Sequence, residues 1–268
     1  MSANIDALTQ FKEVQKQGWA HFAPLETMTT PAAARLVKHA RVVAGQRVLD
    51  VACGTGVVAL TAKLLGARVT GLDLTPELLA RARENASIAG VEIEWHEGDV
   101  EKLSFGNAAF DVVVSQYGHM FAPRPEVALA EMLRVLKPGG TIAFSTWPPE
   151  LFVGRTFSLV GKYMPPPPPG VAPPLWGDPS VVRERLGTAV KDIVFDWGRM
   201  SVPALSAKHH RTMFERTAGP VLKLVEVLSA TDPVRLAAFR GEYEALVSEY
   251  LEDNVVRQDY LLTRATKV

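Results

Sequence analysis

Residues Arg47–Gly56 read RVLDVACGTG, and this stretch decides the fold. Arg47–Cys53 is an apolar run that carries Asp50, which is typical of a buried strand, and the run Val57–Leu65 that follows the Gly54-Thr55-Gly56 turn predicts a helix. A strand, a glycine turn and a helix N-terminus together form a backbone cradle for an anionic or polar ligand. We therefore expect a ligand site at this turn.

Apolar runs and helical segments alternate through the middle of the chain, which predicts a doubly wound parallel sheet with right-handed crossovers. The predicted strands are Arg47–Cys53, Arg68–Leu74, Glu92–Glu97, Phe110–Ser115 and Thr141–Thr146. The predicted helices are Val57–Leu65, a segment from Pro76 (with Thr75 as its cap) to Gly90, and Glu126–Leu136, which Lys137-Pro138-Gly139-Gly140 ends. Ligands of such sheets bind at the carboxyl ends of the strands.

The flanking segments predict helices before the sheet and a lid after its fifth strand. Before the sheet we expect helices over Ile5–Phe22 and over Pro31–Ala40, the second with Thr30 as cap and Pro31 in its first position. After Pro148 we expect a stiff loop at Pro165–Pro169, helices over Asp178–Leu186, Ala207–Leu228 and Pro233–Leu251, and strands over Ile193–Trp197 and Asp259–Arg264. The late strands would close the sheet, and the helices between them would form the lid.

The composition is that of an ordinary globular protein, with 47% hydrophobic and 22% charged residues among 268. Lys+Arg and Asp+Glu both number 29, so the charge gives no reason to expect nucleic acid or a membrane surface as partner. Cys53 is the only cysteine, which excludes an intrachain disulfide and a cysteine-based metal site. We find no signal peptide and no apolar window of membrane-spanning length, and so expect a cytoplasmic protein.

We expect one domain over residues 1–268. Its parts would be N-terminal helices (1–45), a ligand-binding core (46–148), lid and substrate-side insertions with the sixth strand (149–256), and the last strand (257–268). A monomer and a homodimer are both compatible with the sequence.

Two acidic residues end predicted strands beside the glycine turn. Asp73 ends the second strand, where a carboxylate can accept both hydroxyl hydrogens of a ribose; its alternative role is a loop or capping residue. Asp99 follows the third strand, where it can accept an adenine amino hydrogen beside the amide of Val100; its alternative role is a turn residue. The Gly54–Ala59 segment, GTGVVA, also matches the G-x-G-x-x-G/A fingerprint. An NAD(P)-dependent oxidoreductase is therefore an alternative.

The wider pattern resembles the class I S-adenosylmethionine-dependent methyltransferases. The similar segments are VLDVACGTG, GLDLTPELLARAREN, EGDVEKLSF, FDVVVSQYGHMF and RVLKPGGTIAFSTW, in this order between Arg47 and about Trp147. Within that superfamily the chain resembles the type-11 group, related to ubiquinone- and menaquinone-biosynthesis enzymes, which acts mostly on small molecules. The resemblance implies a Rossmann-like seven-stranded α/β sheet, mostly parallel, whose strand seven is antiparallel between strands five and six. Ile193–Trp197 and Asp259–Arg264 would be strands six and seven.

The resemblance also implies S-adenosyl-L-methionine as cofactor, S-adenosyl-L-homocysteine as product, and roles for individual residues. Asp50 and Gly54 would border the methionine end, with Gly56 in the same turn, and Ala52 stands where the family often has glycine. By the same resemblance, the ribose would contact Asp73, the adenine would contact Leu74, Asp99 and Val100, and Ser115 would lie beneath the cofactor.

The implied chemistry is a direct in-line displacement of the sulfonium methyl, which needs a general base only when the acceptor must lose a proton. His119 and Tyr117, after the fourth strand, are the catalytic candidates; His21, His209 and His210 are weaker ones. No carboxylate stands at metal-ligand spacing from His209-His210, so we expect no metal site. A flat or apolar small-molecule acceptor would contact aromatic or apolar residues from the set Trp19, Phe22, Met120, Phe121, Trp147, Phe152 and Trp176. A binding protein that holds the cofactor without turnover is a third hypothesis.

Overall fold

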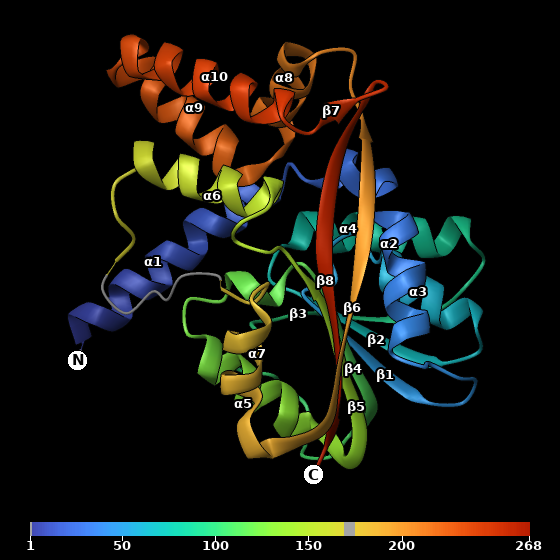
Figure 1. Cartoon of the computed structure of the whole chain (residues 1–268). Helices are drawn as coiled ribbons and strands as arrows, with labels where there is room; N and C mark the ends of the chain where they lie inside the picture. The colour runs from blue at the N-terminus through green and yellow to red at the C-terminus, as the bar shows by residue number, and fades with distance from the viewer. Residues whose placement is uncertain (1, 169–174) are drawn as a thin grey trace.

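The computed structural model describes residues 2–168 and 175–268, with side chains from residue 7 onward. Within these residues, one mixed sheet of eight strands forms the centre of the molecule (Figure 1). Its order is β3-β2-β1-β4-β5-β8-β6, and the short β7 pairs with β8. The strands are β1 Arg47–Val51, β2 Arg68–Asp73, β3 Glu94–Glu97, β4 Phe110–Gln116, β5 Leu136–Thr146, β6 Val190–Pro203, β7 Leu251–Glu252 and β8 Val255–Lys267.

The first five strands are parallel, and β8 runs antiparallel between β5 and β6. This confirms the predicted Rossmann-like topology, including the place of the antiparallel strand. The strand order reverses at β1, which pairs with β2 on one side and β4 on the other. The carboxyl ends of β1, β2 and β4 therefore lie side by side at the switch point, where ligands of such sheets bind.

The helices cover both faces of the sheet and its carboxyl edge. Figure 1 shows α2 and α3 on one side of the sheet and α5 and α7 on the other, with α6, α8, α9 and α10 gathered above the strand ends. We call these last four helices the lid. The described helices are α1 Ser2–Trp19, α2 Glu26–His39, α3 Val57–Leu64, α4 Pro76–Ile88, α5 Pro125–Val135, α6 Phe152–Tyr163, α7 Pro179–Leu186, α8 Ala207–Thr217, α9 Gly219–Thr231 and α10 Pro233–Ser248, with short 3-10 turns η1 Ala23–Leu25, η2 His119–Phe121 and η3 Gly187–Ala189.

Several predicted boundaries outside the central strands are wrong. The second helix begins at Glu26, so Pro31 lies inside it rather than in its first position. The predicted helix Ala207–Leu228 is two helices, because Pro220 can only stand in the first turn of a new helix that begins after Ala218. The sequence reading missed α6 altogether. The last two long strands, β6 and β8, extend well beyond Ile193–Trp197 and Asp259–Arg264.

The predicted proline loop is described only in part. Residues 165–168 belong to no helix or strand, whereas Pro169 lies outside the described residues. No helix in the described ranges has both the length and the apolar composition needed to span a bilayer.

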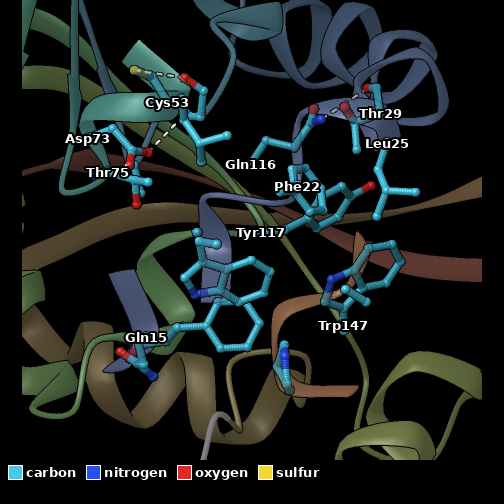
Figure 2. A pocket seen from close by; sticks show the side chains of 18 of the residues that line it. Gln15, Phe22, Leu25, Thr29, Cys53, Asp73, Thr75, Gln116, Tyr117 and Trp147 are labelled. Carbon is cyan, nitrogen blue, oxygen red and sulfur yellow. Dashed lines mark hydrogen bonds between the residues drawn. The ribbon is translucent and has the colours of Figure 1, made fainter. Parts of the chain in front are cut away.

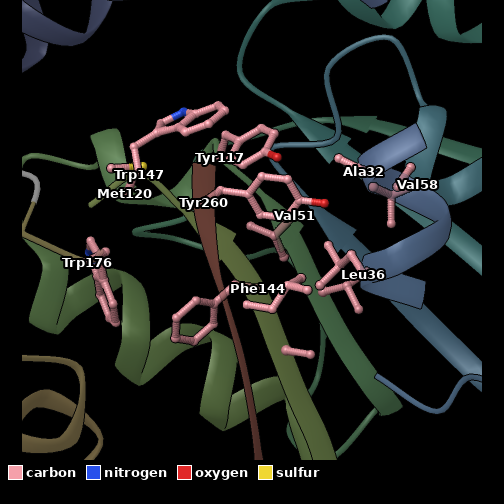
Figure 3. Close-up of a cluster of buried hydrophobic side chains, with 14 of the residues drawn as sticks. Ala32, Leu36, Val51, Val58, Tyr117, Met120, Phe144, Trp147, Trp176 and Tyr260 are labelled. Atoms are coloured by element: carbon pink, nitrogen blue, oxygen red, sulfur yellow. The ribbon is translucent and has the colours of Figure 1, made fainter. Parts of the chain in front are cut away.

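The core lies between the sheet and its helices and continues toward the lid. Val51 on β1 and Phe144 on β5 are fully buried, as is Leu36 on α2 (Figure 3). Tyr117 and Trp147 follow directly after β4 and β5, and their rings stack with centroids 4.0 Å apart and an interplanar angle of 16°. The core thus reaches the carboxyl edge of the sheet, where it becomes one wall of the pocket described below.

Candidate functional site

The turn after β1 has an unusual backbone. Ala52, Gly54 and Gly56 all have left-handed conformations, with φ of +53°, +54° and +82°. For Ala52 this conformation costs about 1 kcal/mol, since only glycine adopts it freely. The methyl group of Ala52 has room because Gly118 faces it: a Cβ on Gly118 would lie 2.5 Å from the Ala52 Cβ. Ala52 stands where the resemblance would place glycine, and the absence of a side chain at Gly118 makes room for its methyl group.

Asp50 is fully buried at the end of β1. Its Oδ2 accepts a hydrogen bond from the backbone N–H of Ala59 in the first turn of α3 (2.9 Å), which ties the helix to the strand. Its Oδ1 has no hydrogen-bond partner among the described residues. Burial raises the pKa of Asp50 well above its usual value, and the nearby Asp73 adds to the shift. Burial thus favours the neutral acid, and a cationic group placed beside the free oxygen would favour the charged carboxylate.

Asp73 ends β2 and holds two loops together. Its Oδ2 accepts the Gly54 N–H and its Oδ1 accepts the Thr75 N–H, each at 2.8 Å (Figure 2). Burial raises the pKa of Asp73, while these two backbone hydrogen bonds oppose the rise. Each carboxylate oxygen can accept more than one hydrogen bond, so the side chain keeps capacity for a bidentate ligand. The two backbone bonds fix its orientation.

Asp99 is joined to the N-terminal helix. Its Oδ1 accepts the N–H of Glu101 (2.9 Å), and its Oδ2 forms an ion pair with Lys12 on α1 (2.6 Å). Lys12 also pairs with the buried carboxylate of Glu101 (2.5 Å), which in turn binds Arg124. The helix α1 therefore lies across this end of the site, and its Lys12 lines the pocket, which the sequence analysis did not predict.

These residues line one pocket with a volume of about 240 Å³. Figure 2 shows Asp73 and Thr75 at one side of it and Trp147 at another. Of the predicted cofactor residues, those in the lining are Asp50, Ala52, Gly54, Asp73, Leu74, Asp99 and Val100. Gly56 and Ser115 are not among the lining residues. Gly56 is the N-cap of α3, where a Cβ would lie 2.6 Å from the Trp95 ring.

Ser115 and His119 are both buried and do not line the pocket. The Ser115 hydroxyl is fully buried and accepts the His119 N–H (3.2 Å). The His119 ring is 1% exposed and packs against Phe144 and Trp176, with centroids 4.7 and 4.9 Å away. Burial lowers the pKa of His119 to about 3. The expectation that His119 faces the acceptor as a base is therefore wrong.

Tyr117 does lie in the pocket wall. Its hydroxyl donates to the Met200 sulfur at 3.5 Å, and burial raises the pKa of Tyr117 well above its usual value. The residue thus stays a neutral hydrogen-bond donor at physiological pH and is unsuited to act as a base.

The remaining candidates divide between the pocket and the core. Trp19, Phe22, Phe121, Trp147 and Phe152 line the pocket, whereas Met120 and Trp176 do not. His21 and His209 do not line it either.

His210 is fully buried and stacks on Phe214, and its Nδ1 lies 3.4 Å from the Tyr243 hydroxyl. No metal-binding group of three or more His, Cys, Asp or Glu side chains occurs in the described ranges.

A second group of residues lines the pocket, although no motif in the sequence predicts that they belong to a site. Met200 on β6, Phe214 on α8, Tyr243 on α10 and Gln258 on β8 all line the pocket. They lie far from the glycine turn along the chain and reach the site only because the lid and the two antiparallel strands fold over the carboxyl edge of the sheet. The position of Gln258 in the pocket follows from the register of β6 and β8, in which Gln258 lies opposite Met200. The sequence alone does not give this register.

Comparison with known proteins places this pocket in context. A family model described as a methyltransferase domain matches residues 49–144. An uncharacterized protein of Mycobacterium tuberculosis is 36% identical over 257 residues, which cover 94% of this chain and 93% of that protein. The ubiquinone biosynthesis O-methyltransferase of Nitrosococcus oceani is 34% identical over 149 residues, covering 53% of this chain and 63% of that enzyme.

Two solved structures share the fold. Phosphoethanolamine N-methyltransferase 2 of Haemonchus contortus, in complex with S-adenosylhomocysteine, has a TM-score of 0.55 and 20% identity over 88% of this chain and 52% of that one. The [4+2]-cyclase SpnF has a TM-score of 0.54 and 23% identity over 89% of this chain and 81% of that one. At these identities the likeness concerns the fold alone.

Proposed function

The chain belongs to the class I S-adenosylmethionine-dependent methyltransferases, and from that premise we propose that it transfers a methyl group from S-adenosyl-L-methionine to a small-molecule acceptor by direct in-line displacement. One observation carries the proposal: carboxylates from three successive strand ends, Asp50, Asp73 and Asp99, line a single pocket together with a glycine turn. No nucleic acid or membrane partner is part of the proposal, and the protein would act as a monomer or homodimer.

The residues present fit an adenosyl cofactor. The unpartnered Asp50 Oδ1 suits the cationic amino group of its methionine part, and burial would strengthen that pair. The Asp73 carboxylate, held by two backbone bonds, suits the ribose diol. Leu74 and Val100 offer apolar contacts for the adenine. Asp99 offers a carboxylate for the adenine amino group, which would bind beside Lys12 or replace it as the partner of Asp99.

The cofactor, when bound, supplies an electrophilic methyl group on a sulfonium. The protein's own residues position the acceptor and exclude water. Trp19 and Phe22 from the N-terminal segment and Phe152 and Phe157 from α6 enclose the pocket on its lid side. Tyr117 can donate a hydrogen bond but cannot take a proton at neutral pH. The chain thus contributes orientation rather than general-base catalysis.

A thermal-shift experiment with S-adenosylmethionine, S-adenosylhomocysteine and NADPH tests the proposal, since a ligand of the native state raises the melting temperature. We expect both adenosyl compounds to raise it and NADPH to leave it unchanged. A shift with NADPH alone would support the oxidoreductase alternative and overturn ours.

A turnover assay separates methyl transfer from binding alone. Its readout is S-adenosylhomocysteine released in the presence of neutral aromatic acceptors that carry hydroxyl or thiol groups. The SpnF structure makes this assay necessary, because a protein named as a cyclase has the same fold. Adenosyl binding without product from any acceptor would favour a cofactor-binding protein without methyl transfer.

A further inference from the structure

The pocket has two ends with different chemistry. Its charged lining side chains are Lys12, Asp50, Asp73 and Asp99, and all four belong to the cofactor end described above. Lys12 is moreover neutralised by its ion pairs with Asp99 and Glu101. The rest of the lining, from the N-terminal segment, the lid, β6, β8 and the segments after β4 and β5, carries no charged side chain in the part of the chain that the structure describes. We call this part the acceptor chamber.

Aromatic rings form a flat wall in the acceptor chamber. Tyr117 and Trp147 line the chamber and stack in parallel, and Tyr260 on β8, which is not among the lining residues, meets Tyr117 edge to face with centroids 5.5 Å apart (Figure 3). A second aromatic series, Trp19, Phe121 and Phe157, has successive centroid distances of 4.9 and 5.4 Å. Rings in this arrangement favour a flat apolar partner over a branched or charged one.

Two amide side chains in the pocket lining each have one buried atom without a hydrogen-bond partner among the described residues, the Gln116 oxygen at the end of β4 and the Gln258 nitrogen on β8. Gln258 is 3% exposed, and its amide nitrogen has no hydrogen-bond partner among the described residues. It lies opposite Met200 in the β6–β8 register, and the Met200 sulfur already accepts the Tyr117 hydroxyl. Buried amide groups are almost always hydrogen-bonded, because an unmade bond is costly. The unpartnered amide therefore points to a hydrogen-bond acceptor on the molecule that the chamber binds.

We propose that the methyl acceptor is an uncharged, flat, largely apolar molecule and that Gln258 determines its specificity by donating a hydrogen bond to an oxygen of that molecule. This inference rests on the proposed function only in so far as it calls the ligand a methyl acceptor. The binding preference of the chamber does not depend on that function. A carboxylate or ammonium on the ligand would lose its water in the acceptor chamber and find no opposite charge there. The Thr156 hydroxyl is already engaged, since it donates to the Phe152 carbonyl (2.9 Å), and the unpartnered Gln116 oxygen can accept a hydrogen bond but cannot donate one.

Three naphthalene derivatives of matched shape test the inference. 2-Acetylnaphthalene carries a neutral oxygen, 2-ethylnaphthalene carries none, and 2-naphthoate carries a negative charge. Each is titrated into the full chain loaded with S-adenosylhomocysteine, and quenching of tryptophan fluorescence reports binding, since Trp19 and Trp147 line the pocket. We expect the acetyl compound to bind about fivefold more tightly than the ethyl compound. We expect the naphthoate to bind at least about a hundredfold more weakly than the acetyl compound.

Two variants assign the preference to its residue. Gln258→Met keeps the length of the side chain and removes the unpartnered amide, so it should fold at least as well as the wild type. Its preference for the acetyl over the ethyl compound should fall to about one. Thr156→Val, the matched control in the same chamber, should keep the wild-type preference.

The inference is overturned if the naphthoate binds as tightly as the acetyl compound, if Gln258→Met keeps the wild-type preference, or if none of the three probes binds. A parallel titration with S-adenosylhomocysteine alone keeps the two proposals apart. Failure of that titration would refute the methyltransferase proposal, and the three probes would then be compared on the ligand-free protein, where the same preferences are expected.

Discussion

Replacing Asp73 by alanine removes a side chain that we assign to both the fold and the cofactor. In the free protein the substitution deletes two hydrogen bonds from backbone N–H groups to a carboxylate, those of Gly54 and Thr75 at 2.8 Å each. Bonds of this charged type contribute roughly 1.5–3 kcal/mol each. Burial already raises the pKa of Asp73 and so opposes its charge, which favours the low end of that range. We expect the free energy of unfolding to fall by about 3 kcal/mol.

The same substitution should weaken the adenosyl ligand separately. Two hydrogen bonds from ribose hydroxyls to Asp73, at about 1 kcal/mol or more each, amount to about 2 kcal/mol, or roughly thirtyfold in affinity. Isothermal titration calorimetry with S-adenosylhomocysteine measures the loss, at a temperature where circular dichroism shows the variant to be folded. We expect at least about a tenfold decrease.

Asp111→Ala is the matched control for this measurement. Asp111 also accepts a backbone N–H, that of Arg47 (2.7 Å), and binds the Lys137 ammonium (2.5 Å), but it stands at the start of β4, away from the pocket. It should lose stability and keep its affinity for S-adenosylhomocysteine. The reasoning is refuted if folded Asp73→Ala binds the ligand as the wild type does, or if Asp111→Ala loses as much affinity.

Three further predictions concern residues around the same turn. His119→Phe should reduce the loss of stability at acidic pH. Burial holds the pKa of His119 at about 3, so the free energy of unfolding of the wild type falls by up to about 1.4 kcal/mol per pH unit as pH falls from about 6.5 toward 3. Urea midpoints that shift equally in both proteins between pH 7 and pH 4 would contradict this. Asp50→Asn keeps an oxygen for the Ala59 N–H and removes a buried charge. Because burial raises the pKa of Asp50, the wild type loses stability as pH rises above about 4, and the melting temperature of the variant should exceed that of the wild type by more at pH 8 than at pH 4. Calorimetry should show that the variant binds S-adenosylhomocysteine about tenfold more weakly. Unchanged binding would exclude a contact between Asp50 and the amino group of the ligand. Gly118→Ala should destabilise by roughly 1–3 kcal/mol, since its Cβ would meet that of Ala52 at 2.5 Å, and Ala52→Gly should restore part of the loss, whereas strictly additive effects in denaturation would refute the pairing.

The sequence predicts the position of the pocket at the glycine turn well because each part of this region is local. A carboxylate at a strand end and a glycine turn before a helix are read within ten residues, and parallel strands bring their carboxyl ends to one edge. Asp50, Asp73 and Asp99 therefore meet where expected. The side chains at the end of β4 face different sides for a physical reason too. Successive residues of a strand face opposite sides, so Gln116 lines the pocket while Ser115 turns inward and accepts the His119 N–H.

The acceptor chamber could not be predicted in the same way. Met200, Phe214 and Gln258 come from three elements that are distant in sequence, and each is an unremarkable member of its own strand or helix. The helix α6 was missed because it follows prolines and carries few charges, and the Ala207–Leu228 helix was drawn through Pro220. Residues such as these acquire a role only from the packing of the lid on β6 and β8, which no local pattern encodes.

The chemistry of the acceptor chamber finally predicts how the rate should depend on pH. Burial raises the pKa of both Tyr117 and Tyr243, and the buried His210 beside Tyr243 has its pKa lowered to about 3, so none of these groups accepts a proton readily at neutral pH. None of these side chains therefore takes the proton of the acceptor, and an acceptor that must lose one releases it to water. We expect the pH–rate profile to shift with the pKa of the acceptor when a more acidic analogue is used. A profile with one constant pKa near 7 for every acceptor would instead reveal a protein base and contradict the assignment of a purely orienting role to this chain.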